Sequence, residues 1–169
     1  MSISMYQTSV PVFIRMLNNL AEILKKAEAF AEAKDIQLDV LFNSRLAPDM
    51  FPLSRQIQIA SDAAKGCVAR LAGMEPPSYE DNEKTFADLY ARIDKTIAFL
   101  NTLTPAQIDG TEQKPVSVKL PKNTLNLQGM QFLLNFSMPH FYFHVTTAFD
   151  ILRHNGVEIG KRDFLGKFE

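Results

Sequence analysis

Apolar residues recur every three or four positions over a long stretch near the beginning of the chain. The stretch follows Thr8 and Ser9, two residue types that commonly cap helices, and Pro11 suits the first turn of a helix. The pattern continues to about Lys34 and places the apolar side chains on one face, so it predicts a long amphipathic helix. The apolar face consists of Val12, Phe13, Met16, Leu17, Leu20, Ile23, Leu24, Ala27 and Ala31.

A second helix is predicted over residues 52–72, where apolar residues again recur at helical spacing. Gly73 follows, and glycine commonly ends a helix because it adopts a left-handed conformation without steric cost. The connector over residues 35–50 is expected to hold a short helical turn at residues 38–44. Residues 74–79 contain two adjacent prolines and are expected to form a loop.

A third helix is predicted from about Asp81, with an apolar stripe that extends to Leu103. Charged residues are interleaved with this stripe, a pattern typical of a helix face in contact with water. The residues expected to face water are Glu83, Lys84, Asp88, Arg92 and Lys95.

The last part of the chain combines two short β-prone runs with another helical pattern. Residues 116–120 and 124–127 lie on either side of a short polar turn, which indicates a small β-hairpin. The helical pattern then covers residues 128–155 but is interrupted by Pro139. Either the helix kinks there, or Pro139 begins the main part of the last helix. Gly156 is expected to end it.

Four long amphipathic helices with one long connection predict an all-α four-helix bundle, with a small β-hairpin before the last helix. The 169 residues suit one domain, spanning residues 1–169. The net charge is −1, so composition gives no general attraction to nucleic acid or to an anionic membrane. No apolar stretch is long enough to span a bilayer. The single cysteine, Cys67, and the absence of a signal-like N-terminus favour a cytoplasmic location.

Two histidines in the last helix are the strongest candidates for chemistry. His140 and His144 are four residues apart, so on a helix they lie on one face, one turn apart. Two imidazoles in this arrangement can converge on a transition metal. The alternative is that they are hydrogen-bonded histidines within an aromatic core. His154 lies too far along the helix to join them and is expected to interact with the helix C-terminus.

A third ligand would have to come from a facing helix, and the second helix offers two polar candidates. Gln58 and Asp62 are four residues apart on one face of that helix. Asp62 could bind a metal directly or accept a hydrogen bond from a ligating imidazole. The alternative is a carboxylate that is solvated, or paired with Arg55 or Arg70. The residues leave this choice open.

Other catalytic patterns are absent or incomplete. Residues 156–161 resemble a phosphate-binding loop only loosely, because the spacing is one residue short and no Ser or Thr follows Lys161. Cys67 lies on the apolar stripe of the second helix, which favours a packing role over a nucleophilic one. The aromatic residues around Phe141 are not interleaved with basic residues, so they favour a core over a nucleic-acid surface.

Several segments resemble proteins of the DinB/YfiT-like four-helix-bundle superfamily. The fourth-helix segment has a His-x-x-x-His pair, then Leu152-Arg153 and a helix-ending Gly156, and the second helix ends in Arg70-Leu-Ala-Gly. The segments beginning at Arg45 (RLAPDMFPL), Phe141 (FYFHVTTA) and Ile151 (ILRHNGV) resemble an uncharacterised bacterial domain family placed in that superfamily. The resemblance covers nearly the whole chain.

The resemblance implies a bundle that often binds a divalent metal, commonly zinc or nickel, through three histidines. Two of them lie on the fourth helix, where His140 and His144 match, and one lies on the second. The second helix here contains no histidine, so Gln58 or Asp62 would have to replace it. The better understood members are thiol-cofactor-dependent transferases and isomerases and metal-dependent hydrolases, and they are often homodimers.

Two functional hypotheses follow. In the first, the protein is a metal-dependent small-molecule transferase or hydrolase, with the metal held by His140 and His144 and the shell completed by Asp62 or Gln58. In the second, it is a metal-free bundle that binds a small molecule or a protein partner, or forms a homodimer without catalysis. Binding to nucleic acid is not expected, because the net charge is −1.

Overall fold

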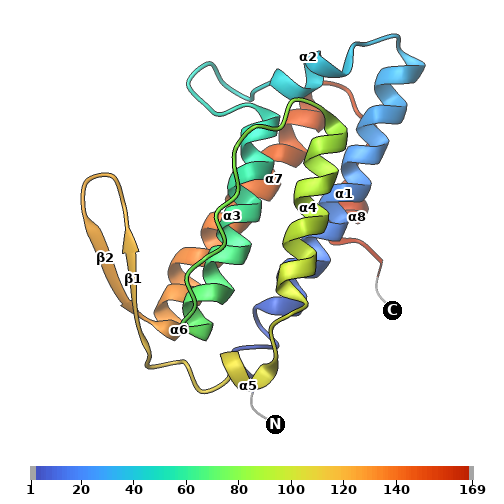
Figure 1. The fold of residues 1–169 in the computed structure, drawn as a ribbon. Helices are drawn as coiled ribbons and strands as arrows, with labels where there is room; N and C mark the ends of the chain where they lie inside the picture. Colours follow the sequence, from blue (N-terminus) through green and yellow to red (C-terminus); the bar gives the residue numbers. More distant parts are fainter. Residues whose placement is uncertain (1–2, 168–169) are drawn as a thin grey trace.

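Four long helices form a bundle in the computed structural model, which describes residues 3–167 (Figure 1). The long helices are α1 (Val10–Ala33), α3 (Leu53–Ala72), α4 (Phe86–Leu100) and α7 (Met138–His154). Helices α1 and α3 each pack against both α4 and α7, so the four enclose a common core. This arrangement confirms the predicted four-helix bundle.

A two-stranded antiparallel hairpin precedes the last long helix, as predicted. Strand β1 (Pro115–Lys119) pairs with β2 (Thr124–Gln128), and Ser117 lies opposite Asn126. One face of β1 is buried through Val116 and Val118. The hairpin lies beside α3 in Figure 1. The short elements are α2 (Leu38–Asn43), α5 (Pro105–Ile108), α6 (Gly129–Gln131), the π-helix η1 (Phe132–Ser137) and α8 (Lys161–Leu165).

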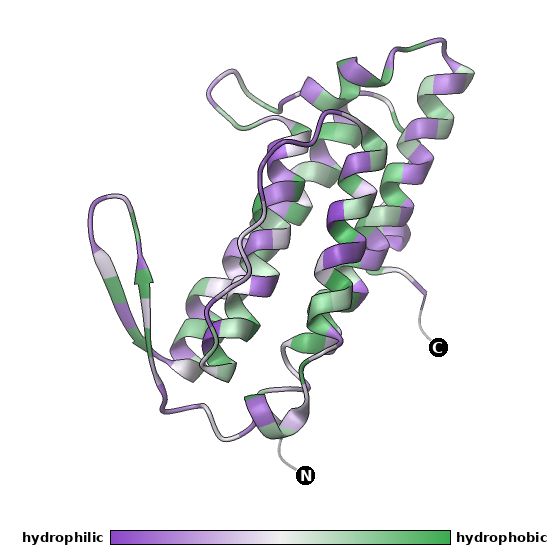
Figure 2. Cartoon of the chain, viewed as in Figure 1, coloured by the Kyte–Doolittle hydropathy of each residue, from purple (hydrophilic) through white to green (hydrophobic). Residues whose placement is uncertain are grey.

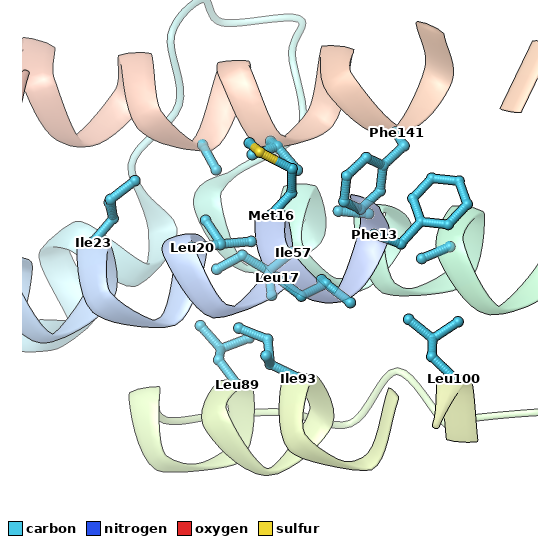
Figure 3. Close-up of a cluster of buried hydrophobic side chains, with 14 of the residues drawn as sticks. Phe13, Met16, Leu17, Leu20, Ile23, Ile57, Leu89, Ile93, Leu100 and Phe141 are labelled. Atoms are coloured by element: carbon cyan, nitrogen blue, oxygen red, sulfur yellow. The ribbon is translucent and has the colours of Figure 1, made fainter. Parts of the chain in front are cut away.

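The core lies along the axis of the bundle and is built from the predicted apolar faces (Figure 3). Phe13 of α1 meets Phe141 of α7 edge to face, with ring centroids 4.9 Å apart. Apolar and polar residues alternate around the long helices (Figure 2), as expected for helices with one face in the core. Other fully buried side chains are Leu17 and Leu20 of α1, Ile57 of α3, and Leu89, Ile93 and Leu100 of α4.

Helix α4 begins at Phe86, later in the chain than the predicted start near Asp81. The reason is a capping box. Thr85 accepts a hydrogen bond from the backbone N–H of Asp88, and the Asp88 carboxylate accepts one from the backbone of Thr85. Residues 81–84 are therefore free of helical geometry and extend along the bundle.

Pro139 lies in the first turn of α7, which answers the question that the sequence left open. The preceding residues do not form a separate helix, because α6 and η1 run into α7 without a break. Proline has no N–H to donate to the preceding turn, and the wider π-helical turn directly before it accommodates that loss. The predicted capping at Ser9 is different in detail. Ser9 precedes α1, but its hydroxyl donates back to the Met5 carbonyl.

Within residues 3–167, no helix is both long enough and apolar enough to cross a membrane.

Candidate functional site

His144 is a buried polar residue on the face of α7 that packs against α3. Its side chain contacts Gln56 of α3, with 2.6 Å between His144 Nδ1 and Gln56 Oε1. The Gln56 amide nitrogen donates to the Phe51 carbonyl, which fixes the amide with its oxygen toward the imidazole. An amide oxygen only accepts, so His144 carries its hydrogen on Nδ1. In the neutral ring, Nε2 then keeps a free lone pair.

His140 lies beside His144, as the four-residue spacing predicted. Their ring centroids are 4.8 Å apart. Burial lowers the pKa of His140, and it lowers the pKa of His144 from 6.5 to about 4; a proton on His144 would also be repelled by the Arg55 cation and by His140 whenever that ring is protonated. Both rings are therefore neutral at pH 7. The pair offers imidazole nitrogens as hydrogen-bond acceptors or as ligands.

The two candidates for the missing ligand position are engaged elsewhere. Gln58 accepts from Arg55 at 3.0 Å and donates to Glu83 at 2.8 Å. Asp62 is paired with Lys65 at 2.8 Å and with Arg92 at 2.9 Å. Their ligation of a metal stays a prediction.

Arg92 is the centre of an ion-pair cluster between α3 and α4. It was expected to face water, but its side chain is only 1% exposed, so that expectation was wrong. Its guanidinium pairs with Asp62, with Asp81 at 3.0 Å and with Glu83 at 2.7 Å. Asp62 belongs to α3, whereas the segment before α4 folds back over α3 and α4 and brings Asp81 and Glu83 to Arg92. Periodicity within one helix could not reveal this, because the covering segment lies outside that helix.

A small pocket of about 170 Å³ lies between α3, the hairpin and η1. Its walls are mostly apolar, and His140 reaches it from α7. Asp62 lines it as well, so the structure brings His140 and Asp62 to one cavity although Asp62 is already paired. The lining consists of Ile59, Asp62, Ala63, Cys67, Arg70, Val118, Leu120, Phe132, Phe136, Ser137 and His140.

Cys67 is buried in the wall of this pocket, as its place on the apolar stripe predicted. Burial raises the pKa of its thiol to about 12. The thiolate is the nucleophilic form of cysteine, and it is scarce at pH 7 with such a pKa. Cys67 therefore serves as part of the apolar wall.

Gln56 is the residue that the sequence analysis missed. A signal for it exists, because Gln56 follows Leu53 by three residues and precedes Ala60 by four, on the buried stripe of α3. A glutamine on an apolar stripe needs a buried partner. The sequence alone could not identify that partner as His144, which is 88 residues away.

A metal centre can be tested against the donor atoms that the structure brings together. In the described part of the chain, no group of three or more His, Cys, Asp or Glu residues is placed to hold a metal ion. Catalytic zinc sites usually have three protein ligands, and the histidine pair supplies two. Gln56 contacts His144, but its oxygen already accepts from that imidazole. The donor set is therefore one ligand short.

Fold and site together define a four-helix bundle with a histidine pair on its last long helix, next to a small pocket. The chain is similar to a DinB family member from Shewanella denitrificans, known from a crystal structure. The two are 44% identical, the match covers 96% of this chain and 92% of that one, and the TM-score is 0.89. This likeness confirms the DinB-like bundle. A comparison with curated proteins gave no match.

The family called Domain of unknown function (DUF1993) matches residues 5–165, nearly the whole chain. The protein belongs to this family. The resemblance to an uncharacterised domain family of the DinB/YfiT-like superfamily is thereby confirmed.

Proposed function

We propose that the protein binds a small organic molecule in the pocket between α3, the hairpin and η1, and that this binding needs no resident metal. The observation that carries the proposal is the pocket itself, about 170 Å³ with mostly apolar walls. A cavity of about 150 Å³ lined by apolar side chains takes up benzene, so the volume suits one small ring. His140 supplies a neutral polar contact at one wall.

The test is a titration with benzyl alcohol, followed by NMR of the pocket residues in the presence of a chelator. Ala63→Phe on α3 fills the pocket and should abolish saturable shifts. Ala91→Phe is the matched control, because Ala91 is exposed on α4 and lies outside the pocket. Equal binding to the wild type and Ala63→Phe, or no binding to the wild type, would contradict the proposal.

A second candidate is the metal-dependent transferase or hydrolase that the resemblance implies. One observation favours it: Gln56 holds His144 Nδ1, and metal-binding histidines usually have their second nitrogen held in this way. Because the donor set is one ligand short, we assign no reaction step to a metal.

Elemental analysis after incubation with zinc or nickel separates the two candidates. If the protein is a metal-dependent transferase or hydrolase, the wild type should contain about one ion per chain, and His144→Ala should lose it. His154→Ala is the control, because His154 lies in the last turn of α7, away from the pair. Retention of the metal by His144→Ala, or no metal in any sample, would contradict this second reading.

A homodimer is also part of the proposal, because the resemblance implies it. Large apolar side chains are exposed on the outer side of η1 and α7 at Leu134 (47%) and Phe143 (56%), and a partner copy could cover them. Light scattering would measure the mass in solution, and a monomer at all concentrations would contradict this part. The cytoplasmic location stays a prediction.

A further inference from the structure

Arg70 is a cation in the pocket wall without a carboxylate partner among residues 3–167. Its side chain is partly buried, and its Nη1 atom donates to the Gly66 carbonyl one turn earlier at 2.9 Å. Other cations of α3 differ, since Arg55 pairs with Asp81 and Lys65 pairs with Asp62. Arg70 therefore has donors left for a group that enters the pocket.

The position of Arg70 depends on a glycine in the interior of α3. A Cβ atom added to Gly66 would lie 2.6 Å from Arg70 Nη1, which is too close for any real contact. Glycine is unfavourable inside a helix relative to alanine. Helix α3 thus has a glycine, which is unfavourable in a helix, at position 66, where the guanidinium of Arg70 lies across the helix surface.

The other titratable groups of the pocket do not cancel this charge. Asp62 is already paired with Lys65 and Arg92. His140 and Cys67 are both uncharged at pH 7, because burial disfavours their charged forms. The wall as a whole carries the uncompensated positive charge of Arg70.

The remaining walls suit a flat apolar body. Phe132 and Phe136 of η1 stack with centroids 6.0 Å apart and an angle of 20° between the rings, and both line the pocket. Val118 and Leu120 of the hairpin cover another side. The volume of about 170 Å³ holds a single aromatic ring with a small substituent.

We infer that the natural ligand of this pocket is a small aromatic carboxylate, whose carboxylate pairs with Arg70 while its ring packs against Phe132 and Phe136. This inference rests on the proposed small-molecule function and names the class of ligand. Arg70 binds the carboxylate through paired N–H donors, a geometry that guanidinium groups provide and neutral side chains do not.

The experiment compares benzoate with two neutral relatives of the same size, benzamide and benzyl alcohol, by calorimetric or NMR titration. The wild type should bind benzoate roughly tenfold or more tightly than benzamide, because only the acid forms a charge-assisted bidentate contact. Arg70→Gln should remove that preference. Arg45→Gln is the matched control, since Arg45 is exposed in the loop before α3 and should leave the preference intact.

Gly66→Ala provides a second test that does not remove the charge. The added methyl group displaces the guanidinium from its position, so benzoate affinity should fall while benzyl alcohol affinity stays the same. A merely structural role for Arg70 would change both affinities together. The thermal midpoint of each variant shows that it is folded.

The outcomes separate this inference from the proposed function. Binding of benzyl alcohol without a preference for benzoate would overturn the carboxylate assignment and leave the pocket function standing. Failure of all three probes to bind the wild type would overturn both. Full benzoate affinity in Arg70→Gln would overturn the role of Arg70.

Discussion

The two sides of α3 handle polar groups in opposite ways. Toward α4, the cations Lys65 and Arg92 are buried together with carboxylates that balance them. Toward α7 and the hairpin, the histidines are neutral, and the charge of Arg70 has no carboxylate partner within residues 3–167. Both sides contain buried polar side chains, and the small pocket opens between α3, the hairpin and η1, with Asp62 at its border to the α4 side.

The difference indicates which side serves the fold and which is available for a ligand. Charges removed from water are stable only when partners replace the lost hydration, and the α4 side is arranged in this way. A polar group left without an internal partner beside a cavity can take one from a ligand. Stability measurements should therefore respond most strongly to changes on the α4 side, and binding measurements to changes on the pocket side.

The largest effect is expected for Arg92→Met. The substitution leaves Glu83, whose side chain is 8% exposed, buried without its cation, and breaking a buried pair in this way costs about 3–5 kcal/mol of unfolding free energy. Urea denaturation would measure the loss, and limited proteolysis should show cleavage in the released segment 79–83. A loss below about 1 kcal/mol would mean that the Arg92 cluster stabilises the fold no more than an exposed ion pair does. The α4 side of α3 would then not differ from the pocket side in its contribution to stability.

The next effect is the pH dependence that the buried histidine imposes. The pKa of His144 is about 4 in the folded chain, below its ordinary value of 6.5, so the folded state binds fewer protons than the unfolded state between these values. Stability is full above pH 6.5 and falls as the pH is lowered through this window, by up to about 3 kcal/mol. The burial of His140 acts in the same direction.

Thermal midpoints between pH 7.5 and pH 4 would measure this dependence. His144→Gln removes the titrating group and should give a flatter profile over the window. Carboxylates with lowered pKa values, such as Asp163, lose their contribution at lower pH and do not mimic the effect. Parallel profiles for the wild type and the variant would show that His144 is not held neutral by burial.

A smaller change of opposite sign is expected for Gly66→Ala. Alanine is favoured over glycine inside a helix by about 1 kcal/mol, and the atom in its way is the end of a flexible side chain. The variant should therefore be more stable in urea while it binds benzoate less well. A less stable variant would mean that Arg70 in its present position supports the fold, which would weaken the distinction between the two sides of α3.

The smallest effect is expected for Lys25→Ala on the outer face of α1. Lys25 pairs with Glu22 at 2.6 Å, but the two side chains are 61% and 69% exposed. Water and salt screen such a pair, so the urea midpoint should not change measurably. A clear loss of stability would show that exposed ion pairs also stabilise this fold. The large effect expected for Arg92→Met could then not be attributed to burial alone.

Much of the fold could be predicted because it depends on local patterns. The helical spacing of apolar residues in α1 and α3 and the two β-prone runs of the hairpin were sufficient to place those elements. The start of α4 was placed too early, because the capping box at Thr85 was not recognised in the sequence. The adjacency of His140 and His144 followed from helix geometry alone.

The sequence by itself determined the bundle, the hairpin and the histidine pair, because each depends on residues close together in the chain or on the periodicity of one element. Only the tertiary structure decided the partners: Gln56 for His144, the carboxylates around Arg92, and the pocket in which Arg70 forms no ion pair with any carboxylate of residues 3–167. These depend on contacts between elements that are far apart in the chain. Whether a polar side chain is solvated, paired or left available is set by the elements that cover it, and the pattern within its own helix does not contain that information.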